Sequence, residues 1–177
     1  MKGLSKKEIE IISELEFYKK YFFESSDIDK FVANKGQKYH TIKKLIQKER
    51  IVKLNKSKYY LVPIKAKSGK WGVHEFILAD EICNGKDYYI GGWSALNYWQ
   101  LTDQIPMQVD IYTTRRQGRT KILNIRVIFH RTSERRIEKA VEREIEGHKF
   151  KIISKEEAEK WIKSKKNYEE KRKNIKN

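Results

Sequence analysis

The chain is poor in cysteine and in long apolar runs, and each shortage excludes a class of protein. One cysteine in 177 residues cannot form an intramolecular disulfide, which fits a reducing cytoplasm. Cys83 follows Ile82 in an apolar setting, so we predict a small buried hydrophobic side chain rather than a nucleophile. Apolar runs such as residues 127–129 are far too short to span a bilayer, and no signal peptide precedes the first amphipathic stretch. We expect a soluble cytoplasmic protein with no membrane partner.

The sequence also lacks the motifs of common metal and catalytic sites. Its four histidines are scattered, without cysteine pairs or a His-x-x-x-His spacing, so we expect no bound metal and no cofactor. Ser68-Gly69-Lys70 has neither the upstream glycine nor the following hydroxyl of a phosphate-binding loop. Asp110 lies in a predicted strand, but no recognisable spacing joins it to the later residues that a nuclease would need. Those residues are Glu142, Glu144 and Lys149. We therefore expect no catalytic residues, and an enzyme is the least favoured class.

What the sequence has in excess is positive charge, and that charge is unevenly placed. The net charge is +16, which points towards a polyanion and most often towards nucleic acid. Residues 1–34 carry six lysines against seven acidic residues, whereas residues 35–58 carry eight lysines and one arginine against Glu49 alone. A basic block after a neutral one indicates one face of a small domain directed at phosphates. A lysine-coated, solvated face is the alternative.

Three helices are predicted before residue 50. Ser5 is a suitable N-cap, and Glu8 three residues later completes a capping box. Ser25-Ser26-Asp27 offers a second start, and a third helix is predicted over residues 37–48. Helical spacing places Ile9, Ile12 and Leu15 inward on the first helix, with Ile11 as a further candidate. It places Ile42, Leu45 and Ile46 inward on the third helix.

A β-hairpin is predicted directly after the third helix. Residues 51–54 and 59–62 are β-prone, and the polar residues 55–58 join them. Three helices followed by a basic hairpin are the order of a winged helix-turn-helix. In that module the third helix enters the major groove of DNA, and the wing contacts the backbone or the minor groove.

The predicted contacts to double-stranded DNA fall on the third helix and the wing. Short polar side chains can read base edges, whereas lysines mainly anchor phosphates. The predicted base readers are Gln37, His40, Thr41 and Gln47. The predicted phosphate contacts are Lys38, Lys44 and Lys48 on the helix and Lys53, Lys56 and Lys58 on the wing.

A change of composition predicts the domain organisation. We expect a DNA-binding domain over residues 1–64, a linker over residues 65–70, and a second domain over residues 71–177 that ends in a basic tail. Residues 109–114 and 122–130 alternate as half-buried strands, and residues 142–153 predict a hairpin that turns at Gly147. Hairpins mixed with short helices favour a small α+β domain with antiparallel strands.

The segment GGWSALNYWQLTDQIP, residues 91–106, concentrates bulky aromatics in an otherwise basic chain. We interpret Trp93, Tyr98 and Trp99 mainly as core residues of the second domain. A surface that stacks on single-stranded nucleic acid is the alternative, because three arginines follow nearby. They are Arg115, Arg116 and Arg119. Asn97 is a further functional candidate if its side chain points outward.

The same segment carries a resemblance to a known family. Residues 89–106, with Thr113-Thr114-Arg115-Arg116 after them and residues 78–83 before them, resemble the AbiEi antitoxin family, as does the stretch 42–54. Members are two-domain transcriptional regulators paired with nucleotidyltransferase-like toxins. The resemblance implies that the first domain represses its own operon, with a cooperative pair on an inverted repeat. It also implies a second domain that counteracts the toxin without a stable complex.

The candidate antitoxin surface combines these observations. The resemblance places Arg115 and Arg116 on the basic surface of the second domain, and the sequence pattern adds Asn97 and Arg119. The alternative to an autoregulatory antitoxin is a stand-alone DNA-binding regulator without a toxin. Its second domain would then serve dimerisation or another partner.

Overall fold

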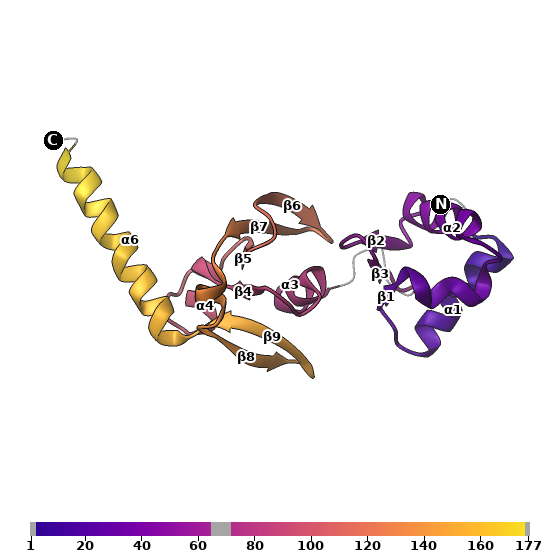
Figure 1. Cartoon of the computed structure of the whole chain (residues 1–177), viewed down its shortest axis with the longest axis horizontal. Coiled ribbons are helices and arrows are strands. Elements are labelled where there is room, and N and C mark those ends of the chain that lie inside the picture. The colour runs from indigo at the N-terminus through magenta and orange to yellow at the C-terminus, as the bar shows by residue number, and fades with distance from the viewer. Residues whose placement is uncertain (1–2, 65–71, 176–177) are drawn as a thin grey trace. The chain divides into compact units, whose positions relative to one another are not determined.

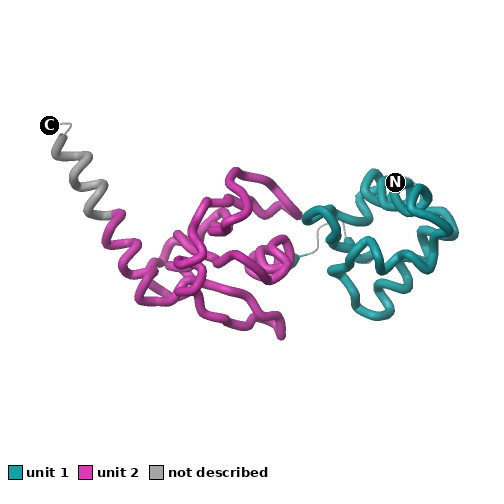
Figure 2. The backbone as a smooth tube through the Cα atoms, in the orientation of Figure 1, with its two compact units in different colours: residues 1–73 teal, residues 74–177 magenta. Residues whose placement is uncertain are grey.

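The computed structural model describes residues 3–64 and 72–175, and for residues 166–175 it describes only the backbone. The chain divides into two compact units, residues 1–73 (unit 1) and residues 74–177 (unit 2), which Figure 2 distinguishes by colour. Both units combine helices with antiparallel strands, so the predicted α+β class is confirmed. The linker predicted at residues 65–70 lies outside the described residues. No helix in the described part of the chain has the length and apolar character needed to cross a bilayer.

Unit 1 is built from three helices and one small sheet. Its elements are α1 (Lys6–Phe17), β1 (Phe22–Glu24), the 3₁₀ helix η1 (Ser25–Phe31), α2 (Lys35–Gln47), β2 (Ile51–Lys53) and β3 (Lys58–Leu61) (Figure 1). The three strands are antiparallel in the order β1-β3-β2. The predicted hairpin is therefore confirmed, and a third strand that the sequence did not reveal lies on the far side of β3.

The start of α1 follows its sequence signal. The Ser5 hydroxyl accepts the Glu8 N–H at 3.3 Å, and the Glu8 carboxylate accepts the Ser5 N–H at 2.6 Å, which confirms the capping box. Ile12, Leu15 and the further candidate Ile11 are buried, whereas Ile9 is 47% exposed and was wrongly placed inward. The core of unit 1 therefore meets α1 along a line through residues 8, 11, 12 and 15.

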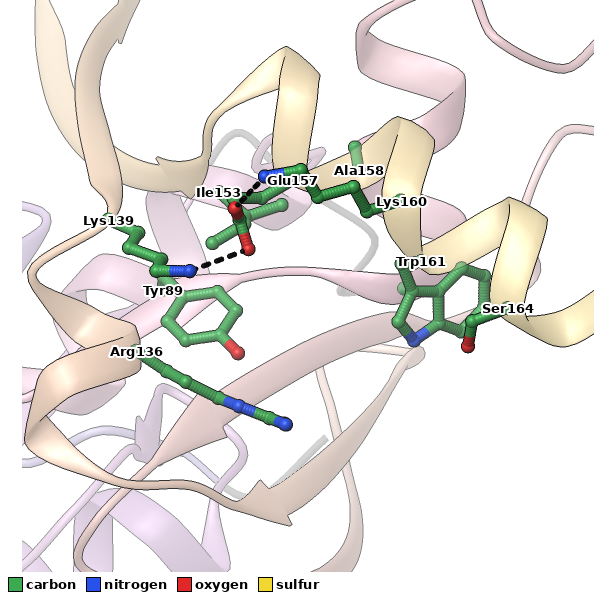
Figure 3. A pocket seen from close by; sticks show the side chains of 10 residues that line it. Tyr89, Arg136, Lys139, Ile153, Glu157, Ala158, Lys160, Trp161 and Ser164 are labelled. Carbon is green, nitrogen blue, oxygen red and sulfur yellow. Dashed lines mark hydrogen bonds and ion pairs between the residues drawn. The ribbon is translucent and has the colours of Figure 1, made fainter.

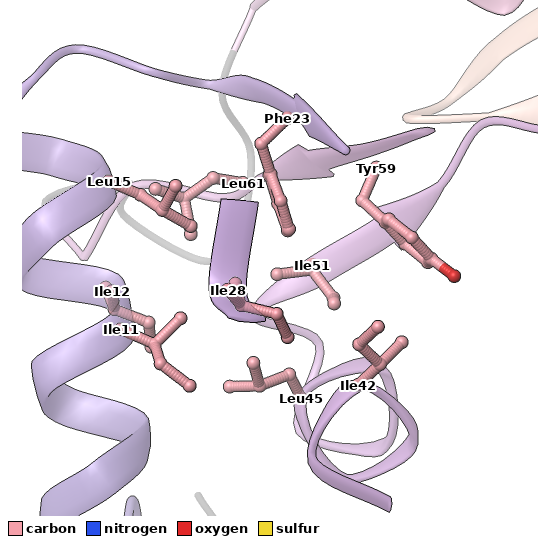
Figure 4. Close-up of a cluster of buried hydrophobic side chains, with 10 residues drawn as sticks. All are labelled: Ile11, Ile12, Leu15, Phe23, Ile28, Ile42, Leu45, Ile51, Tyr59 and Leu61. Carbon is pink, nitrogen blue, oxygen red and sulfur yellow. The ribbon is translucent and has the colours of Figure 1, made fainter. Parts of the chain in front are cut away.

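The core of unit 1 fixes the orientation of α2. Apolar side chains from α1, η1, α2 and all three strands converge in one cluster (Figure 4). Ile42 and Leu45 enter it from α2, as predicted, but Ile46 is 37% exposed and was wrongly placed inward. Burying one Ile or Leu side chain contributes about 2 kcal/mol. Burial of Ile42 and Leu45 therefore leaves the opposite side of the helix in solvent.

Unit 2 contains one six-stranded sheet with helices packed on it. Its elements are α3 (Glu75–Cys83), β4 (Tyr88–Ile90), α4 (Gly92–Tyr98), β5 (Val109–Thr113), β6 (Gly118–Ile122), β7 (Ile125–Arg131), α5 (Glu134–Ile137), β8 (Ala140–Ile145), β9 (His148–Ile153) and α6 (Lys155–Ile175) (Figure 1). The strand order is β6-β7-β5-β4-β9-β8. The predicted hairpin with its turn at Gly147 is β8–β9, and Gly147 has a φ of +76°.

The sheet is mixed rather than purely antiparallel. The β4–β5, β6–β7 and β8–β9 pairs are antiparallel, whereas β5 pairs with β7 and β4 pairs with β9 in parallel. Parallel neighbours need long connections, which leave no local turn signal in a sequence. The β8–β9 hairpin was predicted from its turn, but the β6–β7 hairpin was missed, because its turn falls inside the single strand predicted over residues 122–130. The parallel pairings were not predicted either.

The aromatics of the 91–106 segment have different roles. Tyr98 packs edge-on against Phe150, and the Trp99 indole donates a hydrogen bond to the Ile153 carbonyl at 2.9 Å. Trp93 is 38% exposed and meets Trp161 of α6 edge-on. Two of the three rings therefore build unit 2, as predicted, and Trp93 remains partly at the surface.

Candidate nucleic-acid interface

Helix α2 begins at a side-chain cap that also restrains one predicted base reader. The Asn34 carboxamide oxygen accepts the Gln37 N–H at 2.9 Å, and the Gln37 side-chain oxygen accepts the Ala33 N–H at 2.7 Å. Gln37 is half-buried. Its side-chain oxygen thus helps to close the turn before α2, which restrains the orientation of the side chain.

The exposed side of α2 carries both polar and apolar groups. Three of the predicted contacts, His40, Lys44 and Gln47, are exposed there. Lys35, Lys43 and Ile46 of α2 are also exposed and were not predicted as contacts, and the sequence left Tyr39 open between the core and a phosphate contact. Tyr39 is 69% exposed. Spacing could have revealed Lys43, because it lies one helical turn from both Tyr39 and Gln47.

Three predicted contacts on α2 are engaged within the protein instead. Thr41 is only 7% exposed, because it lies on the side of the helix that holds Ile42 and Leu45 in the core, so it is withdrawn as a base reader. Lys38 forms an ion pair with Asp29 at 2.6 Å. Lys48 forms one with Glu8, also at 2.6 Å.

The Glu8–Lys48 ion pair is largely buried. Glu8 is 3% exposed, and the Lys48 side chain is 16% exposed. Burial alone would raise the pKa of the Glu8 carboxyl, but hydrogen bonds from Lys48 and Ser5 outweigh it and hold that pKa below its ordinary value of 4.5. Lys48 thus serves to tie the end of α2 to the start of α1.

The hairpin presents its lysines on a turn closed by Asn55. The Asn55 side-chain oxygen accepts the N–H groups of Ser57 at 3.0 Å and Lys58 at 2.9 Å, an arrangement that Asn adopts readily. Lys53 and Lys56 are exposed, and Lys58 is half-buried.

Charge is concentrated on these exposed elements. Among the described residues, no ion pair involves Lys43, Lys44, Lys53 or Lys56. Glu49, just beyond α2, is the acidic residue of residues 35–58. Ammonium groups without an acidic neighbour bind phosphate as point charges and release counterions when they do so. The arrangement is chemically suited to a polyanion.

Most side chains of the predicted antitoxin surface make contacts within unit 2. Arg115 clamps the Asp87 carboxylate at 2.6 Å and donates to the Cys83 carbonyl at 3.3 Å. The Arg116 guanidinium stacks 3.5 Å from the centre of the Phe129 ring, and burial lowers its pKa. Asn97 donates to the Gln104 carbonyl at 3.1 Å.

Arg119 differs from the other three residues of that predicted surface. It lies on β6 and is exposed. The four predicted residues therefore share unit 2, but three of them brace loops or stack on a ring.

The residues that a nuclease site would need lie on different strands of the sheet. Asp110 is on β5 and Glu142 on β8, with β4 and β9 between these strands. Three strand spacings separate them by about 14 Å. Asp110 faces His130 at 2.8 Å, and Glu142 pairs with Lys149 at 2.8 Å.

One group of potential metal ligands comes from distant parts of the sequence. Asp80, Glu81 and His148 each present a ligand atom, and these atoms lie within 4.8 Å of one another. The Asp80 carboxylate already accepts the Tyr88 hydroxyl at 2.6 Å and faces the His148 ring at 3.0 Å. Sequence spacing missed the group because 68 positions separate Asp80 from His148.

Comparison with known proteins adds no relative. No protein-family model matches the chain, and a search of curated proteins finds no similar sequence. The resemblance to the AbiEi family therefore depends on the sequence motifs quoted above.

Proposed function

We propose that the protein is a DNA-binding transcriptional regulator and that unit 1 acts as a winged helix-turn-helix. The exposed side of α2 is the observation that carries this proposal: it presents His40, Lys43, Lys44 and Gln47, and neither lysine forms an ion pair within the described part of the chain. The order of helices and strands in unit 1 and the strand order β1-β3-β2 support it. In such a module α2 enters the major groove as recognition helix, and the β2–β3 hairpin is the wing.

The proposed contacts follow from exposure. His40 and Gln47 read base edges, and Ile46 offers an apolar contact to a thymine methyl group. Lys43, Lys44, Lys53 and Lys56 bind phosphates. This set keeps five of the contacts predicted from the sequence and adds Lys43 and Ile46. It leaves out the five predicted contacts that are buried or half-buried: Gln37, Lys38, Thr41, Lys48 and Lys58.

On the strength of the AbiEi resemblance, we propose further that the chain is the autorepressing antitoxin of an operon with a nucleotidyltransferase-like toxin. It would act in the cytoplasm on its own promoter. A stand-alone regulator without a toxin is the second candidate, and the tightly braced Arg115 and Arg116 favour it, because their contacts within unit 2 account for them without a partner. A neighbouring nucleotidyltransferase-like gene whose toxicity the chain relieves would decide for the antitoxin.

The test of DNA binding is a titration of the full chain with its own upstream DNA and with a scrambled duplex, over a series of salt concentrations. We expect a preference for the upstream duplex that persists as salt rises. Lys44→Gln should weaken binding to both duplexes and lower the slope of log affinity against log salt by about 0.9. Lys19→Gln, an exposed lysine just after α1, is the matched control and should change neither. Equal binding of both duplexes at every salt concentration would exclude a specific regulator.

A further inference from the structure

Unit 2 has a pocket that the proposed DNA-binding function does not use. The pocket has a volume of about 280 Å³ and lies where the first turns of α6 meet β4, α5 and the start of α4 (Figure 3). Three cationic side chains, Arg136, Lys139 and Lys160, line it against one acidic side chain, Glu157. The volume is close to the lower end of small-molecule sites, which suits one compact ligand rather than a polymer groove.

Two of the three cationic side chains in the pocket form ion pairs within the protein, and all three keep N–H donors for a ligand. Lys139 and Lys160 each contact a different oxygen of the Glu157 carboxylate, at 3.1 and 2.8 Å (Figure 3). An ammonium group has three N–H donors, so each lysine keeps two for a ligand. Arg136 forms no ion pair among the described residues, and its planar guanidinium matches a phosphate in bidentate fashion.

A rigid aromatic wall completes the pocket. Tyr89 lines it and stacks on Tyr112 at 5.0 Å with nearly parallel rings, and Tyr112 stacks in turn on His130 at 4.6 Å. Trp161 also lines the pocket and meets Trp93 edge-on at 5.7 Å. Tyr89 is only 5% exposed and closes the base of the pocket, whereas the half-buried Trp161 is the ring that a ligand can reach.

The backbone next to the wall is adapted to this packing. A Cβ atom at Gly91 would lie 2.7 Å from the Tyr112 ring, so only glycine fits there. Burial raises the pKa of Tyr89 and brings that of Tyr112 to about 12, so both phenols stay neutral at physiological pH and repel no anion.

We propose that this pocket binds a nucleoside phosphate, with the phosphate held by Arg136, Lys139 and Lys160 and the base against the half-buried ring of Trp161. The cationic side attracts the phosphate, and aromatic faces stack on any base. The ligand is either a free nucleotide or the 5′-phosphorylated end of a strand. The proposal is independent of DNA binding by unit 1.

The experiment is calorimetric titration of the full chain with ADP, GDP and UDP, with adenosine and pyrophosphate as the two halves of a nucleotide. We expect at least one nucleotide to bind about tenfold or more tightly than either half, since both contacts act together. Arg136→Gln should weaken nucleotide binding about tenfold, as expected for a charged hydrogen bond. Arg135→Gln is the matched control, because it is an exposed arginine of the same helix outside the pocket, and it should have no effect.

Two further variants separate the pocket from other sites. Trp161→Leu should weaken nucleotide binding and leave pyrophosphate binding unchanged, with folding checked by circular dichroism; if that variant is unfolded, Arg136→Gln decides. Lys44→Gln in unit 1 should leave nucleotide binding unchanged.

A 5′-phosphorylated trinucleotide distinguishes the two sources of the ligand. If it binds as tightly as ADP and Arg136→Gln weakens its binding, the ligand is a strand end. If only free nucleotides bind, the ligand is a small molecule. No saturable binding at millimolar nucleotide, equal binding of pyrophosphate and ADP, or equal effects of Arg135→Gln and Arg136→Gln would overturn the proposal.

Discussion

The ammonium group of Lys48 lies 2.6 Å from a carboxylate oxygen of Glu8, across 40 positions of the chain. The same oxygen accepts the backbone N–H of Ser5 at 2.6 Å. One buried carboxylate therefore caps α1 and anchors the C-terminal end of α2. Together with burial of Ile42 and Leu45 in the core, this contact sets which side of α2 is available to a partner. It leads to the first two predictions.

Lys48→Met should destabilise the folded protein by about 3 kcal/mol, because it leaves the buried Glu8 carboxylate without its partner. Lys44→Met, four residues earlier on the exposed side, should change stability by less than about 0.5 kcal/mol. Urea unfolding of the full chain, followed by circular dichroism, measures both. Adding Glu8→Gln to Lys48→Met should recover part of the loss, since Gln preserves the capping box without a charge. Equal stability of the Lys44 and Lys48 variants would show that the ion pair does not anchor the helix.

The Glu8 carboxylate should also make stability depend on pH in the acid range. Its pKa in the folded protein is lowered below the ordinary 4.5, so its stabilising contribution is fully present above that pH and is lost as the pH falls through the lowered folded value. The free energy of unfolding of the unmodified chain should therefore fall more steeply below pH 4.5 than that of Glu8→Gln. The pKa of Asp27 is also lowered, because its contact with Lys20 outweighs the effect of burial. Asp27 is present in both proteins, so its contribution to the pH dependence cancels when they are compared. Parallel curves would contradict the assignment.

Base recognition and phosphate binding should depend on different side chains of α2. His40→Ala and Gln47→Ala should each reduce the preference for the upstream duplex, by about 1–3 kcal/mol where the side chain contacts a base, and leave the salt slope unchanged. Competition binding against a scrambled duplex measures the preference. Thr41→Ser is the control: its side chain is buried, so it should alter neither quantity. A change in preference on Thr41→Ser would mean that α2 binds DNA in another orientation.

The single cysteine should be chemically inert in the folded protein. Cys83 is 6% exposed, and burial raises the pKa of its thiol to about 12 from an ordinary 9.0, so the reactive thiolate is scarce. Reaction with an aromatic disulfide reagent at pH 8 should be slow in buffer and rapid in denaturing urea. Rapid reaction of the native protein would show that α3 opens from the sheet readily.

The local features of the fold could be predicted from the sequence. The Ser5–Glu8 capping box, the β2–β3 and β8–β9 hairpins and the excess of lysine after residue 35 each depend on residues a few positions apart. Backbone hydrogen bonds, turn geometry and helical periodicity act over that range. The sequence therefore determined the α+β class and the region of the candidate interface.

Only the tertiary structure decided which side chains in those regions are available. Thr41 is buried and Ile46 is exposed because the core accepts only one side of α2. Lys48 pairs with Glu8 because the fold brings these two residues together from distant parts of the chain. The tertiary structure also paired β4 with β9 in parallel and brought Tyr89, Arg136 and Trp161 around one pocket. These contacts join segments tens of residues apart, and the packing of the whole core sets them, which no local pattern records.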